Sequence, residues 1–198
     1  MDVRSPISCV IPSLDGPVLE TLANVSVPMS LTEIYRRCSR GSLPGIRVVL
    51  GRLVISGVVH EVSGRYILNR DHLAASAIES LATLHGHLVE RIGSEVDSWN
   101  FETTVVGLFG SAARRDGDSS SDIDVLIVSD EECPDEFVSN LAQKIELWTG
   151  NHAQMLSLTT QEMNRLVAAR EPILTNWEHD LEVIRGSESA MAFTGADA

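Results

Sequence analysis

Two apolar runs, Thr103–Phe109 and Val125–Val128, constrain the fold of this chain more than any other feature. Both are short enough to be buried strands, and a polar segment joins them. The residues that stand out in and around this segment are, in chain order, Gly110, Ser111, Asp122 and Asp124. Successive side chains of a strand point to opposite faces, so the two aspartates should project to the same side, about 7 Å apart. The sequence therefore predicts a pair of carboxylates on one face of a sheet.

The chemistry of this segment suits a phosphate ligand with a divalent cation. Two carboxylates with no Lys or Arg between them are ligands that Mg²⁺ prefers. Gly110 lets the backbone come close to a ligand, and Ser111 adds a hydroxyl and an amide. A nucleoside triphosphate such as ATP, bound with Mg²⁺, fits both groups. The alternative interpretation is a surface loop rich in Ser and Asp that only connects two strands.

The spacing of these residues resembles the polymerase-beta nucleotidyltransferase superfamily, and most of all its minimal nucleotidyltransferase branch. The family signature is a hydrophobic residue, Gly-Ser, about ten further residues and then Asp-x-Asp on a strand. Ala113 and Arg114 also occupy the usual small-then-Arg positions after Gly110-Ser111. The resemblance covers roughly residues 80–185. It implies that the chain transfers a nucleotide from a nucleoside triphosphate to an acceptor.

The resemblance also assigns roles to residues. Asp122 and Asp124 would hold the Mg²⁺ that carries the triphosphate, and Gly110 and Ser111 would bind its β- and γ-phosphates. Arg114 and Arg115 would neutralise its charge, although both could equally be solvated loop side chains.

One position departs from the family pattern. The family places a third carboxylate on a later strand, and the matching residue here is Gln154. An amide can coordinate a metal but adds no negative charge and cannot act as a base. Three alternatives remain open: a reduced but active site, a substitute acid such as Glu178 or Asp180, or a nucleotide sensor.

Charge divides the chain into two parts. Residues 1–80 carry eight arginines against seven acidic residues, a net charge of +1, whereas residues 81–198 carry a net charge of −14. Such asymmetry indicates two domains with different partners. We predict domains at 1–70 and 71–185, followed by a flexible tail at 186–198. No run of about 18 apolar residues and no signal-peptide pattern occurs, so a cytoplasmic location without a membrane is expected, and the three scattered cysteines agree with it.

The first domain has the pattern of a winged helix-turn-helix. Ser30 and Glu33 form a capping box for a helix, Pro44 begins another that Gly57 ends, and Val58–Val62 and Arg65–Leu68 read as a hairpin. Ser30–Arg70 carries a local net charge of +5. The arginines predicted to contact DNA are Arg40, Arg47, Arg52 and Arg65. Winged helices also serve as dimerisation or protein-docking modules, and a homodimer is compatible with this pattern.

The second domain is expected to mix helices and strands. Apolar residues recur at helical spacing through Asp71–Trp99, which predicts one long helix, with a break near Gly86 as a further option. Further helices should begin at Pro134, Thr159 and Pro172 and further strands at His152 and Leu181. The predicted fold class is α+β, with a winged helix-turn-helix before a small nucleotidyltransferase-fold mixed sheet flanked by helices.

Two functions follow from these patterns. The first is a Mg²⁺-dependent nucleotidyltransferase fused to a DNA-binding module, with tRNA or a protein as acceptor in a toxin–antitoxin role. The second is a DNA-binding regulator or antitoxin in which the nucleotidyltransferase fold is a catalytically reduced nucleotide sensor.

Overall fold

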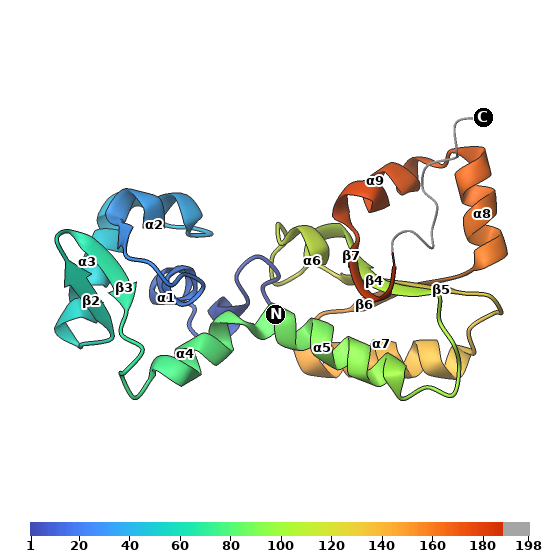
Figure 1. Cartoon of the computed structure of the whole chain (residues 1–198), viewed down its shortest axis with the longest axis horizontal. Coiled ribbons are helices and arrows are strands. Elements are labelled where there is room, and N and C mark those ends of the chain that lie inside the picture. The colour runs from blue at the N-terminus through green and yellow to red at the C-terminus, as the bar shows by residue number, and fades with distance from the viewer. Residues whose placement is uncertain (188–198) are drawn as a thin grey trace. The chain divides into compact units, whose positions relative to one another are not determined.

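The computed structural model describes residues 1–187, and these divide into two compact units, Asp2–His85 and Gly86 onward together with Met1 (Figure 1). Each unit has its own buried core. The predicted tail lies outside the described residues except for Gly186, which ends the last strand, and Ser187. Within residues 1–187 no helix is both long and apolar enough to cross a membrane.

The first unit combines four α-helices with a three-stranded antiparallel sheet in the order β1-β3-β2. Its elements are the 3-10 helix Pro6–Cys9, α1 (Asp15–Ala23), β1 (Met29–Ser30), α2 (Leu31–Arg37), α3 (Leu43–Ile55), β2 (Val59–Val62), β3 (Arg65–Leu68) and α4 (Ala75–Ala82). Their order agrees with the predicted helices and hairpin. The assignment as a DNA-binding winged helix remains a prediction.

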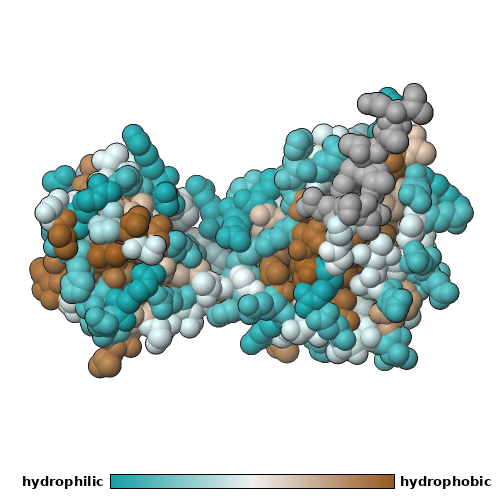
Figure 2. Space-filling view, viewed as in Figure 1, coloured by the Kyte–Doolittle hydropathy of each residue, from teal (hydrophilic) through white to brown (hydrophobic). Residues whose placement is uncertain are grey.

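The local signals of the first unit act as the sequence predicts. The Ser30 hydroxyl accepts a hydrogen bond from the Glu33 amide, and the Glu33 carboxylate accepts one from the Ser30 amide, so the capping box of α2 is complete. Helix α3 then buries Ile46, Val49 and Leu50 against the core. Apolar patches interrupt the hydrophilic surface of this unit on the face drawn in Figure 2.

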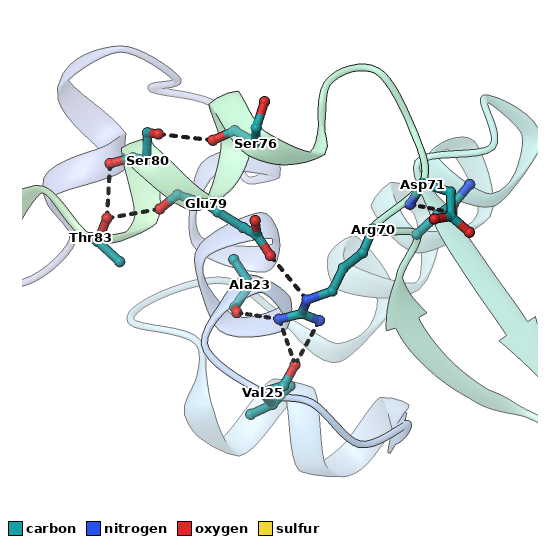
Figure 3. A network of polar contacts seen from close by, with 9 residues as sticks. Ala23, Val25, Arg70, Asp71, Ser76, Glu79, Ser80 and Thr83 are labelled. Carbon is teal, nitrogen blue, oxygen red and sulfur yellow. Dashed lines mark hydrogen bonds and ion pairs between the residues drawn. The ribbon is translucent and has the colours of Figure 1, made fainter.

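The prediction of one long helix over 71–99 is wrong. The structure has two helices, α4 and α5 (Leu84–Asp97), which are separated at Thr83. Helix α4 belongs to the first unit because its Ile78 is buried in the core of that unit. Arg70 adds a surface contact, since its guanidinium donates to Ala23 O at 3.1 Å and forms an ion pair of 3.0 Å with Glu79 of α4 (Figure 3). Residues 71–85, which the sequence assigns to the second domain, therefore lie in the first unit.

The second unit is a mixed four-stranded sheet in the order β6-β5-β4-β7. Its strands are β4 (Val105–Phe109), β5 (Ile123–Ser129), β6 (Ala153–Thr159) and β7 (Glu182–Gly186), and its helices after α5 are α6 (Gly110–Arg114), α7 (Asp135–Thr149), α8 (Thr160–Ala169) and α9 (Pro172–Asp180). Strand β5 pairs antiparallel with β4 and parallel with β6. This mixed α+β architecture is the predicted fold class.

Helices cover both faces of the sheet. On one face α5 and α7 lie side by side (Figure 1), joined by an ion pair of 2.6 Å between Glu95 and Lys144. On the other face α8 and α9 bury Met163, Leu174 and Trp177 against the strands. The same cluster includes Val105 of β4 and Leu126 of β5, so it holds together the two strands beside which the aspartates lie.

Candidate functional site

The site is built where β4 ends beside the start of β5. The antiparallel register places Phe109, the last residue of β4, opposite Asp124. Gly110 follows with φ of +66°, and a Cβ added there would overlap Asp124 Oδ2. Positive φ strains other residues, and the carboxylate leaves no space for a side chain. Glycine at 110 is therefore what allows Asp124 to lie against the turn into α6.

The two aspartates flank Ile123, and the charge of Asp122 acts on Asp124. Asp122 directly precedes β5 and is exposed, whereas Asp124 lies within β5 and is half-buried. Burial and the negative charge of Asp122 raise the pKa of Asp124 above its usual value, and the nearby charge of Arg114 opposes this rise. A half-buried carboxylate whose pKa is raised by a second carboxylate is a place where a cation would be stabilised.

The loop before Asp122 is held at both ends. Asp118 Oδ1 accepts hydrogen bonds from the amide and the hydroxyl of Ser120, at 2.8 and 2.7 Å. The amide of buried Asn151 donates to Ser121 O at 2.8 Å, which attaches the loop to the residues just before β6. These contacts fix the backbone on the N-terminal side of the aspartate pair. The role of Asn151 is not predicted, since a lone Asn before a strand carries no signal of it.

The two arginines of the turn differ in their surroundings. Arg114 Nε donates to Asp116 at 2.8 Å and its Nη1 donates to Asp180 at 2.6 Å, so Arg114 is held from two sides. The hydrogen bonds that Arg114 donates to Asp116 and Asp180 raise the pKa of Arg114. Arg115 caps α6 with φ of +56° and is exposed. The fold thus brings Arg114, but not Arg115, into a network with acidic residues.

Gln154, the residue that matches the third carboxylate of the family pattern, lies in β6. In the parallel register of β5 and β6, Gln154 lies opposite Asp124, and its side chain is exposed. Of the substitute acids considered, Asp180 binds Arg114. Across residues 1–187 no group of three or more His, Cys, Asp or Glu is arranged to hold a metal ion. The donor set at this point is therefore two carboxylates and an amide oxygen.

Three of the four arginines predicted to contact DNA form hydrogen bonds or ion pairs within the first unit. Arg40 donates to Pro12 O at 2.6 Å, Arg52 forms an ion pair with Asp15, and Arg65 forms one of 3.0 Å with Glu33. Arg47 is exposed on α3, and no contact of its side chain is found among the described residues. The same α3 surface carries Val48 and Ile55, which are 72% and 90% exposed.

Comparisons with known proteins bear on the second unit. Residues 94–171 match the family model described as Polymerase beta, Nucleotidyltransferase. This segment contains Gly110, Ser111, Asp122 and Asp124 together with Gln154. No curated protein matches the chain.

Solved structures of toxin–antitoxin proteins resemble about half of the chain. One is a mutant of the toxin-antitoxin MntA-HpeT, 14% identical, which covers 53% of this chain and 79% of its own with a TM-score of 0.40. A toxin-antitoxin with AMP-PNP is 16% identical, with coverages of 53% and 79% and a TM-score of 0.39. The tri-AMPylated Shewanella oneidensis HEPN toxin in complex with MNT antitoxin is 16% identical, with coverages of 53% and 75% and a TM-score of 0.35.

The segment matched by the family model contains the residues of the site. The Gly110 turn, Asp122 and Asp124 at the start of β5, and Gln154 of β6 all fall within it. Residues 94–171 of this chain therefore match the nucleotidyltransferase domain of the polymerase beta family.

Proposed function

We propose that the second unit transfers a nucleoside monophosphate from a Mg²⁺-bound nucleoside triphosphate to a macromolecular acceptor. The observation that carries this proposal is the contact of Asp124 with the Gly110 turn, beside the carboxylate of Asp122. It joins two acidic ligands to a backbone turn that can approach a phosphate. A connecting loop would need neither the positive φ nor the close approach.

The residues fit a divalent cation. Asp122 and Asp124 supply two carboxylate oxygens, and Gln154, opposite Asp124, adds an amide oxygen. Mg²⁺ prefers such oxygen ligands and keeps several waters or phosphate oxygens as its remaining ligands. When bound, the ion would offset the charge that builds up on the phosphate oxygens during transfer.

The chain's own groups would bind and orient the triphosphate. The backbone of Gly110 and the hydroxyl of Ser111 stand at the turn, where they would hold its β- and γ-phosphates. Arg114, whose charge already acts on Asp124, would offset negative charge on the same phosphates. An acceptor oxygen or nitrogen then forms a bond to the α-phosphorus while the bond to pyrophosphate breaks. Gln154 cannot take the acceptor's proton, so we assign that proton to water at the exposed edge of the site.

A macromolecular acceptor, tRNA or a protein, is favoured by the openness of the site. Asp122 and Gln154 are both exposed, so a large acceptor can reach the phosphate. Two cavities of about 450 and 290 Å³ lie at the C-terminal ends of β5 and β6, lined by residues such as Asp130 and Thr159, whereas Asp122 precedes the start of β5. Neither cavity is placed to hold a small acceptor against the aspartates.

Incubation with α-labelled nucleoside triphosphates, Mg²⁺ and total cell protein or RNA tests the proposal. Label should enter one macromolecular product, and the double substitution Asp122→Ala with Asp124→Ala should abolish it. The double substitution Glu131→Ala with Glu132→Ala, two exposed acids beyond β5, is the matched control and should leave the label in place. Absence of transfer to any acceptor by the unaltered chain would count against an enzyme.

A DNA-binding regulator is the second candidate. The observation in its favour is the absence of a third carboxylate at Gln154, together with exposed Arg36, Arg37 and Arg47 on α2 and α3. In this case nucleotide binding would change DNA affinity without transfer. A gel shift with DNA from the chain's own promoter that responds to nucleotide, in the absence of any labelled product, would select this function.

A further inference from the structure

Arg114 is gripped by two carboxylates that come from different parts of the second unit. Asp116 lies 2 residues after Arg114, whereas Asp180 is the last residue of α9 and lies 66 residues after Arg114. The Asp180 side chain is only 16% exposed, against 55% for Asp116. Asp180 is therefore the better shielded and more firmly placed of the two partners.

Helix α9 is itself anchored beside the glycine turn. Trp177, one turn before Asp180, is 1% exposed and meets the ring of Phe109 edge-on, with 5.9 Å between the ring centroids. Phe109 is the residue directly before Gly110. The end of α9 and the start of α6 are thus fixed to each other by an aromatic contact and by an ion pair.

The grip leaves donors of Arg114 available. A guanidinium has five N–H donors, and the contacts with Asp116 and Asp180 use one at Nε and one at Nη1. The two donors on Nη2 have no contact among the described residues. Arg114 belongs to α6, which begins next to Asp124 in the register of β4 and β5, and its charge acts on Asp124.

We propose that Asp180 is a positioning residue that holds Arg114 with its remaining donors toward the triphosphate. This inference rests on the proposed function, because it names the group that orients the phosphate-binding arginine. Asp180 itself does not touch the nucleotide. It restricts a long side chain that would otherwise lose conformational freedom on binding.

Two effects of removing Asp180 have opposite signs, and this makes the proposal testable. Asp180 carries a negative charge near the place of a polyanion, so electrostatics alone predicts that Asp180→Asn tightens nucleotide binding. Loss of the charge-assisted hydrogen bond frees Arg114 and weakens binding. The proposal requires the second effect to be larger.

The experiment is a titration of the full chain with a fluorescent, non-hydrolysable ATP analogue in Mg²⁺. Asp180→Asn should raise the dissociation constant about tenfold, the size expected for loss of one hydrogen bond to a charged group. Asp180→Glu, which keeps a carboxylate, should recover much of the affinity. Glu171→Gln removes the same charge from an exposed position at the start of α9 and should leave the affinity unchanged or slightly higher.

A double-mutant cycle separates positioning from a general structural effect. If Asp180 acts through Arg114, Asp180→Asn should add no loss to that of Arg114→Ala. In the transfer assay, Asp180→Asn should raise KM while kcat changes little. Circular dichroism melting curves verify that each variant is folded.

The possible outcomes distinguish the two proposals. Binding by Asp180→Asn that is as tight as, or tighter than, that of the unaltered chain overturns the positioning role alone. Additive losses in the double variant overturn it as well. Failure of the unaltered chain to bind the analogue overturns the proposed function, and the positioning role with it.

Discussion

The carboxylate of Asp124 lies against the backbone of Gly110, in the space that a Cβ would occupy. The two residues are 14 positions apart in the sequence. Their contact depends on the positive φ of Gly110 and on the register of β4 with β5. A glycine and an aspartate are thus needed together, and a change at either residue should affect the site.

Substitution of Gly110 by Ala should abolish nucleotide transfer. The strained backbone should cost about 1–2 kcal/mol of stability, and the added methyl group should also displace Asp124. Labelled transfer and chemical unfolding measure the two effects. Gly150→Ala is the matched control, because Gly150 has φ of +74° with no atom within 4 Å of an added Cβ. It should cost about 1 kcal/mol and leave transfer intact. Equal activity of both variants would show that the contact is unimportant.

Asp124→Asn should stabilise the protein at neutral pH although it removes activity. The pKa of Asp124 is raised in the folded state above its ordinary value of 3.8 by burial and by Asp122. Ionisation therefore costs stability as pH rises through the interval from 3.8 to the raised value, and Asn avoids this cost. Urea unfolding at pH 7 and near pH 4 should show a difference that shrinks at the lower pH.

Asp118→Asn gives the opposite sign and serves as the control. Hydrogen bonds from Ser120 lower the pKa of Asp118, so its ionised form contributes stability at neutral pH that is lost as pH falls through the lowered pKa. This variant should be less stable than the unaltered chain at neutral pH. If Asp124→Asn instead destabilises the protein as Asp118→Asn does, ionised Asp124 is not destabilised by burial and by Asp122.

The sequence predicts those parts of the structure that depend on neighbouring residues. The capping boxes of Ser30 with Glu33 and of Thr159 with Glu162 both form, and Gly150 ends α7. These signals involve residues only a few positions apart, and their geometry is local. The resemblance to the nucleotidyltransferase family singles out Gln154, and the structure places it opposite Asp124 in the register of β5 and β6.

What the sequence does not predict depends on distant contacts. The apolar spacing continues through residues 81–88, so it cannot show that the helix breaks at Thr83. The partners of Arg52 and Arg114 lie 37 and 66 residues away along the chain. Surface arginines therefore look available for DNA or phosphate in the sequence, and only the fold shows which of them are already paired.

Asn151→Ala should destabilise the second unit and weaken the site. The buried amide holds the loop before Asp122 through Ser121 O, and its removal leaves a carbonyl without its partner. A loss of about 1–3 kcal/mol is expected in chemical unfolding. Asn140→Ala, at an exposed position on α7, should be close to neutral. Affinity for the fluorescent ATP analogue should also fall in Asn151→Ala. An unchanged affinity would show that the loop before Asp122 does not influence nucleotide binding.

Of the four arginines predicted to contact DNA, Arg47 should have the largest effect on DNA binding when it is replaced by Ala. Arg40, Arg52 and Arg65 are held by other groups of that unit, whereas Arg47 is exposed on α3. Gel shifts over a range of salt concentrations should show weaker binding and a salt slope smaller by about 1. Arg165→Ala, an exposed arginine of α8, is the matched control. An equal response to both variants would indicate non-specific attraction or a different surface.

Gln154→Glu should strengthen the site, because it adds the missing carboxylate opposite Asp124. Three carboxylates attract a divalent ion more strongly than two, and the added group can also take a proton from the acceptor. A gain of about tenfold in Mg²⁺ affinity, or about 1.4 kcal/mol, is a reasonable expectation for one further charged ligand. Titration of the transfer rate with Mg²⁺ measures it. Gln143→Glu on α7 adds the same charge at an exposed position away from the strand and should change neither quantity. If Gln154→Glu binds Mg²⁺ more tightly but transfers the nucleotide no faster, Gln154 limits only metal binding. A lower transfer rate would mean that the site is adapted to the neutral amide of Gln154.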